Sequence, residues 1–308
     1  MLVSLLVFII SIAVLIKSSD IFTDEAEIIG KGIGIPSFIV GVTIVAVGTS
    51  MPELASSIMS VYNNNSEIVL SNVIGSNIAN ILLILGISLL FLKTETRIRW
   101  DMFHAEISFL AASTILIGVM MWDGFFSLGE ALIFMIMYLI YLWYNLDVHK
   151  SKNKKIVVST RKISHSDISL IIISVILIAI SADYTVKSAV ELSRALNIGV
   201  EFIGLTAIAV GTSLPELVVS AMAARKNNIE LAIGNVTGSN IFNAFMVASI
   251  PRFLGAVAVP EILISVSFPF LVISTIMLFT VILDRRVHRF EGAILLLMYV
   301  IFILETFL

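Results

Sequence analysis

Two stretches of sequence decide the fold: GVTIVAVGTSMPEL at residues 41–54 and GLTAIAVGTSLPEL at residues 204–217. Each is followed by a second shared motif, NVIGSNIAN at 72–80 and NVTGSNIFN at 235–243. Over 40 residues the two copies align without a gap at a constant offset of 163, and about 22 positions are identical. Self-similarity at a fixed offset indicates two copies of one structural unit, so the chain is built from two related halves.

The composition places both halves in a membrane. Of the 308 residues, 58% are hydrophobic and 13% are charged, and the mean hydropathy is +1.06. Soluble domains carry about 25% charged residues, which excludes an ordinary cytosolic protein. The chain has no cysteine, which excludes thiolate metal sites and disulfides. Its net charge of -3 and its scattered basic clusters give no footprint for nucleic acid.

Long apolar runs recur along the whole chain, and each run of about 20 residues is enough for one membrane-spanning helix. We predict an all-α polytopic membrane protein of ten transmembrane helices, near residues 2–26, 36–62, 67–92, 104–121, 128–148, 168–194, 199–224, 229–252, 260–283 and 290–307. Five helices then fall in the N-terminal repeat, 1–148, and five in the C-terminal repeat, 168–308. Because five is odd, the second repeat is inverted in the membrane relative to the first.

A basic linker at 149–167 joins the two repeats and sets the predicted orientation. Cytoplasmic loops are enriched in lysine and arginine, and placing this linker inside puts 15 of the 19 such residues on that side. Both termini then face outward from the cell membrane. The sequence gives no indication of an oligomer, and a monomer embedded in the lipid bilayer is sufficient for this arrangement.

Two acidic residues stand out because they lie deep inside apolar spans. Glu53 and Glu216 occupy equivalent positions of the two repeats, and an acid at that depth costs about 2.5 to 3.5 kcal/mol on insertion scales. Helix packing explains the repeated glycines and serines, but it does not explain the glutamates. Inverted repeats place substrate sites near the bilayer midplane, where interrupted helices of both halves meet, so we expect the glutamates to form such a site.

The residues around the glutamates provide oxygen atoms. Pro52 has no amide hydrogen for the carbonyl of Gly48, and Pro215 repeats this break, which leaves carbonyls in need of a partner. Ser50 and Glu53 are three residues apart and are expected to share a helix face. Carboxylates, hydroxyls, carboxamides and carbonyls form an all-oxygen set that suits Ca²⁺ and Na⁺. The four histidines, which softer metals would favour, lie outside the motifs.

At these residues, GTSMPE with GSNIAN and GTSLPE with GSNIFN, the sequence resembles the cation/Ca²⁺ antiporter superfamily, and most closely the prokaryotic sodium/calcium exchangers. The resemblance implies that Glu53 and Glu216 bind Ca²⁺ together with the carbonyls of Thr49 and Thr212. It also implies Na⁺ sites completed by Ser50, Ser76, Ser213, Ser239 and the carbonyls of Ala46 and Ala209, with Asn80 and Asn243 lining the middle. The first and sixth helices would slide across the others.

The sequence therefore predicts a secondary active antiporter of Ca²⁺ and Na⁺, with no cofactor and no enzymatic activity. Asn243 stands where some relatives carry an aspartate, which leaves the Na⁺ stoichiometry and the role of protons open. A Ca²⁺/H⁺ antiporter that uses both glutamates as proton carriers is the main alternative. A cation channel is a second one, although inverted repeats within one chain favour alternating access.

Overall fold

The computed structural model describes residues 2–32, 46–92, 95–97, 104–151, 164–226, 229–283 and 286–307, and this part of the chain is almost entirely helical. The longer helices are α1 (Leu2–Gly32), α4 (Met51–Tyr62), α5 (Glu67–Ile78), α7 (His104–Met121), α8 (Leu128–Ser151), α9 (His165–Leu196), α12 (Leu214–Arg225), α13 (Ile229–Phe242), α15 (Phe268–Leu283) and α16 (Arg289–Phe307). Shorter α-helical pieces are α3 (Ala46–Thr49), α6 (Gly86–Leu90), α10 (Val200–Ile203), α11 (Ala209–Thr212) and α14 (Ser249–Arg252). Four segments are π-helical: η2 (Ala79–Leu85), η4 (Gly204–Ile208), η5 (Asn243–Val247) and η6 (Leu263–Ser267). Strand β1 (Thr96–Arg97) pairs antiparallel with β2 (Arg286–Val287).

Several helical runs have the length and composition of membrane spans. Within the described residues, six runs qualify by themselves: 2–22, 67–90, 128–145, 165–196, 263–283 and 289–307. Residues 200–212 and 214–225 form a seventh if the pair, bent by 46°, is one span. Residues 36–45 of the predicted second helix and 152–163 of the predicted linker lie outside the described part, and the count of ten spans stays a prediction.

The surface and the interior have the polarity expected in lipid. Large apolar side chains are exposed along the long helices, among them Ile10, Ile133, Ile173 and Leu297. Serine, threonine and asparagine side chains are instead buried between the helices, and most of them donate to a backbone carbonyl one turn earlier or to another helix. In hydrocarbon, polar groups must be satisfied internally, so this distribution fits a multi-span membrane protein.

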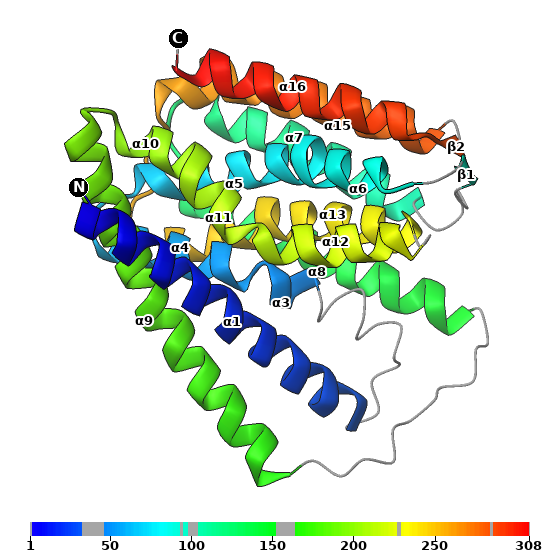
Figure 1. The fold of residues 1–308 in the computed structure, drawn as a ribbon, viewed down its shortest axis with the longest axis horizontal. Coiled ribbons are helices and arrows are strands. Elements are labelled where there is room, and N and C mark those ends of the chain that lie inside the picture. Colours follow the sequence, from blue (N-terminus) through cyan, green and yellow to red (C-terminus); the bar gives the residue numbers. More distant parts are fainter. Residues whose placement is uncertain are drawn as a thin grey trace.

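The helices form two layers of unequal size: α1 and α9 form the smaller layer, and the other helices form the larger layer. Figure 1 shows α1 and α9 running obliquely along one side of the molecule, with α15 and α16 at the opposite edge and α5, α12 and α13 between them. The main hydrophobic core draws its described residues from the larger layer, and none of them comes from α1 or α9. These two helices pack against each other and contact the larger layer through separate small clusters, such as Leu15 of α1 and Ile178 of α9 with Ala55 of α4. The layer of α1 and α9 is therefore a distinct packing unit.

Two proline breaks shape the centre of the larger layer. Pro52 and Pro215 stand in the first turns of α4 and α12, where a missing amide hydrogen costs nothing. Ser50 and Ser213 interrupt the helices just before them, with ψ angles of 8°. Each break ends one helix and begins the next, so the carbonyl end of α3 meets the amide end of α4, and the carbonyl end of α11 meets the amide end of α12.

The larger layer also contains an unusually close approach of backbones beside the proline breaks. A Cβ atom added to Gly75 of α5 would collide with the carbonyl oxygen of Leu205 and would lie 2.9 Å from the Cβ of Ala209. Glycine at this position lets α5 contact η4 and α11 of the other repeat. The two repeats thereby interlock beside the proline breaks.

Candidate cation site

Both predicted glutamates are completely buried at the proline breaks. Glu53 lies in the first turn of α4 and Glu216 in the first turn of α12, and each has a relative exposure of 0%. The preceding proline is the second residue of each helix, and the amide ends of these helices favour a negative charge in the first turn. The carboxylate of Glu53 contacts Ser213, three residues before Glu216, and the carboxylate of Glu216 contacts Ser50, three residues before Glu53. The structure thus brings together the two acids that the repeat placed at equivalent positions.

Serines of the opposite repeat hold each carboxylate. The hydroxyl of Ser213 donates to Oε1 of Glu53 at 2.8 Å, and the hydroxyl of Ser50 donates to Oε1 of Glu216 at 3.1 Å. Ser239 of α13 donates to the same Glu216 oxygen at 3.2 Å. Ser50 was expected to share a helix face with Glu53, but it lies in the break before α4 and binds Glu216 instead. The two repeats are therefore connected through their acids.

The remaining predicted hydroxyls surround this pair. Ser76 of α5 donates to the carbonyl of Ala209 at 3.4 Å, and Thr212 donates to the carbonyl of Ile208 at 3.0 Å. Thr49 lies 3.4 Å from Ser239, hydroxyl to hydroxyl. All of these side chains are buried. Ala46 begins α3, and the proposed role of its carbonyl stays a prediction.

Sequence reasoning did not assign a role to two asparagines that fix the backbone of the glutamates, or to the two serines that accept hydrogen bonds from them. Asn72 donates to the carbonyl of Glu53 at 3.2 Å and to Ser57 at 3.2 Å. In the other repeat Asn235 donates to the carbonyl of Glu216 at 3.4 Å and to Ser220 at 3.1 Å. Their signal in the sequence is the offset of 163, which conserves all four between the repeats. These contacts attach α4 to α5 and α12 to α13.

The two predicted asparagines of the middle differ in their environment. Asn80 in η2 and Asn243 in η5 both have an exposure of 0%. The amide nitrogen of Asn80 donates to Oδ1 of Asn240 at 2.9 Å. Neither polar atom of the Asn243 side chain has a hydrogen-bond partner. Both residues lie in π-helical turns, which occur frequently at functional sites.

Several buried oxygens at this centre accept no hydrogen bond. They are Oε2 of Glu53, Oε2 of Glu216, Oδ1 of Asn80 and Oδ1 of Asn243. Burying an unpaired carboxylate is strongly unfavourable unless a positive charge compensates it. Among the described residues no cluster of three or more His, Cys, Asp or Glu side chains occurs, so a cation here would be bound by two carboxylates and neutral oxygens. This donor set suits Ca²⁺ or Na⁺ better than softer metals.

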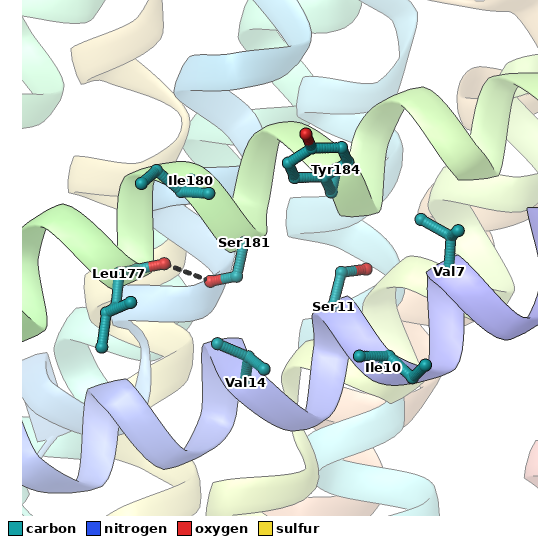
Figure 2. A pocket seen from close by; sticks show the side chains of 8 residues that line it. All are labelled: Val7, Ile10, Ser11, Val14, Leu177, Ile180, Ser181 and Tyr184. Atoms are coloured by element: carbon teal, nitrogen blue, oxygen red, sulfur yellow. Dashed lines mark hydrogen bonds between the residues drawn. The ribbon is translucent and has the colours of Figure 1, made fainter.

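A groove lies between α1 and α9, away from the glutamates. Its volume is about 230 Å³. Figure 2 shows the side chains that line it, from Val7, Ile10, Ser11, Val14, Leu177, Ile180, Ser181 and Tyr184. Its surface is almost wholly apolar, and the hydroxyl of Ser181 is occupied by the carbonyl of Leu177 at 2.6 Å. The groove offers no ligand set for an ion.

Beside this groove, α9 is attached to the larger layer by a polar contact. Asn63, at the end of α4, donates to Oδ1 of Asp183 at 2.8 Å, and Lys187 binds the other carboxylate oxygen at 2.8 Å. Asp183 therefore accepts a hydrogen bond between helices. Its equivalent Asp20 on α1 lies 4.0 Å from Lys17 at an exposed position.

Comparison with known proteins gives consistent matches over nearly the whole chain. The sequence profile of sodium/calcium exchanger proteins matches residues 3–146 and again 166–308. Sodium/calcium exchanger MaX1 of Methanosarcina acetivorans is 32% identical over 99% of both chains, and inner membrane protein YrbG of Escherichia coli is 27% identical over 82% of this chain and 81% of its own. The structure of the sodium-calcium exchanger NCX_Mj soaked with Na⁺ and Sr²⁺ superposes with a TM-score of 0.69, at 28% identity over 97% of both chains.

Buried carboxylates with serine and asparagine partners, inside a multi-span helical fold of this kind, define an ion exchanger, a class of membrane transporter. Within that class, the chain belongs to the sodium/calcium exchanger family.

Proposed function

We propose that this protein exchanges Ca²⁺ for Na⁺ across the cell membrane by alternating access. The observation that carries the proposal is the glutamate pair. Each carboxylate is held at one oxygen by a serine of the other repeat and leaves its second oxygen without a hydrogen bond. Buried, unpaired oxygens of two acids supply the charge and the ligands that a divalent cation requires.

Each ligand has a proposed role. Glu53 and Glu216, with the carbonyls of Thr49 and Thr212, bind Ca²⁺. Na⁺ ions take flanking positions, and their ligands are Ser50, Ser76, Ser213, Ser239 and the carbonyls of Ala46 and Ala209. Asn80 and Asn243 line the middle of the site.

The arrangement in the membrane follows from the repeat. Ten helices in two inverted repeats, 1–148 and 168–308, cross the bilayer, and the basic linker 149–167 faces the cytoplasm with both termini outside. A single chain contains both halves of the site, so a monomer is sufficient for transport. The name of the Escherichia coli relative, an inner membrane protein, supports the cell membrane as the location.

Charge explains why the two ions exchange. Two carboxylates carry a charge of -2, which one Ca²⁺ or two Na⁺ neutralise. An empty site would leave two repelling acids in a low-dielectric interior. Reorientation of the empty protein is therefore unfavourable, and release of one ion on each side is coupled to binding of the other.

The test is radioactive Ca²⁺ uptake into proteoliposomes under an outward Na⁺ gradient, an outward proton gradient or no gradient, with and without an imposed potential. We expect uptake driven by Na⁺ alone. Acceleration by an inside-positive potential would show that more than two Na⁺ leave for each Ca²⁺ that enters. Uptake driven only by protons would identify a Ca²⁺/H⁺ antiporter, and Ca²⁺ flux without any counter-ion would identify a channel.

A further inference from the structure

Two asparagines outside the proposed ligand set cross-connect α5 and α13. The side-chain amide of Asn77 donates to the backbone carbonyl of Asn240 at 3.1 Å, and that of Asn240 donates to the backbone carbonyl of Asn77 at 3.0 Å. Asn77 and Asn240 are equivalent in the repeat, so each copy holds the backbone of the other through the same residue. Both residues are at most 2% exposed.

These backbone contacts determine how the amide groups are oriented. A carbonyl oxygen only accepts hydrogen bonds, so the atom of Asn240 that faces the Asn77 carbonyl must be the nitrogen. The other atom of that amide, Oδ1, then faces Asn80. Since Oδ1 is an acceptor, the atom of Asn80 that lies 2.9 Å from it must be Nδ2. The Oδ1 atom of Asn80 is left as a buried acceptor without a partner.

The equivalent contact in the other repeat, between Asn243 and Asn77, is absent. Oδ1 of Asn77 has no hydrogen-bond partner, and neither polar atom of Asn243 has one. The repeat would allow Asn243 to donate to Asn77 as Asn80 donates to Asn240. Only Asn80 is held with its oxygen free, and so the symmetry of the sequence is broken at this point.

We infer that Asn240 is a positioning residue that turns the Asn80 carboxamide so that its oxygen, and not its amide hydrogens, faces the transported cation. The inference deepens the proposed function and rests on it, because it requires a cation at Asn80. An amide that is free to rotate presents hydrogens to a cation in one of its two orientations. Holding Nδ2 in a hydrogen bond removes that repulsive orientation.

The test is a double-mutant cycle on the full-length protein, with Ca²⁺ and Na⁺ affinities measured by equilibrium binding in detergent. Asn240→Leu removes the acceptor for Asn80 as well as one α5–α13 contact. Asn77→Leu is the matched control, because it removes the equivalent helix contact and leaves Asn80 held. We expect Asn240→Leu to weaken binding of the ion at Asn80 by about tenfold and Asn77→Leu by less than about threefold.

Asn80→Asp supplies the readout that a purely structural role would not change. Both carboxylate oxygens accept, so an aspartate needs no orientation, and adding Asn240→Leu to Asn80→Asp should change affinity by less than about twofold. Equal losses in Asn77→Leu and Asn240→Leu, or a full loss from Asn240→Leu in the Asn80→Asp background, would overturn the inference. If the leucine variants are not monodisperse, the Asn240→Ser and Asn77→Ser pair provides the same comparison.

The outcome separates this inference from the proposed function. A cycle that behaves as expected in a protein whose Ca²⁺ uptake ignores Na⁺ gradients would contradict Na⁺/Ca²⁺ exchange and support the role of Asn240. Na⁺-driven Ca²⁺ uptake together with an additive mutant cycle would support Na⁺/Ca²⁺ exchange and contradict the role of Asn240.

Discussion

At the scale of single residues, the chemistry depends on two carboxylates that are buried without a basic partner among the described residues. Serine hydroxyls satisfy one oxygen of each acid, and the other oxygens are available to a cation. A hydrogen bond to a charged group contributes about 1.5–3 kcal/mol, less than the cost of isolating the charge. The serines therefore orient the acids, and the cation compensates their charge.

The first prediction concerns the charge of the site. Glu53→Gln and Glu216→Gln keep the shape of the side chain and remove one negative charge each, so we expect each to reduce Ca²⁺ affinity more than tenfold. Each should leave a folded protein that can be extracted, as measured by gel filtration and thermal unfolding. If either variant bound Ca²⁺ as tightly as the wild-type protein does, the assignment of the glutamates would be contradicted.

At the scale of elements, helix breaks and close helix contacts place the ligands. The prolines stand in the first turns of α4 and α12 next to the glutamates, and Gly75 lets α5 approach the backbone of η4 and the first residue of α11. The carbonyl of Ala209, a proposed Na⁺ ligand, lies at this approach, 3.4 Å from the hydroxyl of Ser76.

The second prediction tests that approach. Gly75→Ala places a methyl group against the Leu205 carbonyl, a backbone atom that moves only with its helix. We expect a loss of about 1–3 kcal/mol in stability and weaker Na⁺ binding. Gly234→Ala in α13 is the control: nothing lies within 4 Å of its added Cβ, so better helix propensity should leave stability unchanged or higher. A Gly75→Ala protein as stable as the control would show that α5 adjusts freely.

The third prediction concerns the connection between the layers. The chain has no cysteine, so Asn63→Cys with Asp183→Cys provides a unique pair for a short reducible cross-linker between α4 and α9. These side chains are 2.8 Å apart, from Nδ2 to Oδ1. If the layers move relative to each other during alternating access, the cross-link stops Na⁺-driven Ca²⁺ uptake, and reduction restores it.

The control for this cross-link stays within one layer. Thr185 of α9 donates to Ser11 of α1 at 2.9 Å, so Ser11→Cys with Thr185→Cys joins two helices that pack against each other. Uptake should continue after this second cross-link. Continued uptake with α4 joined to α9 would instead place the moving boundary elsewhere in the molecule.

At the scale of the whole molecule, the proposed inversion of the two repeats predicts the contacts of the opposite-facing state. Exchanging the two halves replaces Asp183 by Asp20 and Asn63 by Lys226. In this structure Asp20 is bound only loosely by Lys17, at 4.0 Å. In the other state, α1 should bring Asp20 to Lys226 at the end of α12, as α9 now brings Asp183 to Asn63.

The fourth prediction follows from that exchange. Asp20→Cys with Lys226→Cys should become cross-linked during turnover and trap the protein, with Ca²⁺ uptake lost until reduction. Asp20→Cys with Asn63→Cys pairs positions that the repeat does not relate, and it should not react. Failure of the first pair to react under any ion gradient would mean that the repeats do not exchange conformations.

Much of this organisation was predictable from the sequence because it is local or duplicated. The range predicted at 104–121 agrees with α7, and the breaks at Pro52 and Pro215 lie where the missing amide hydrogen requires them. The acids were identifiable because burying Glu53 and Glu216 in apolar helices is unfavourable without a function. The sequence did not indicate that Ser50 would leave the face of Glu53, since three-residue spacing assumes an unbroken helix.

The sequence by itself determined that the protein is a duplicated helical membrane protein with two equivalent acids among oxygen donors, because apolar length, proline chemistry and repetition depend on neighbouring residues. Only the tertiary structure decided that Ser213 binds Glu53 and that Ser50 binds Glu216. It also decided that Asn80, and not its equivalent Asn243, is held by the facing asparagine. The physical reason is that the two copies of the repeat carry the same residues, so either copy could form a given contact. The packing of this one conformation decides which copy forms it.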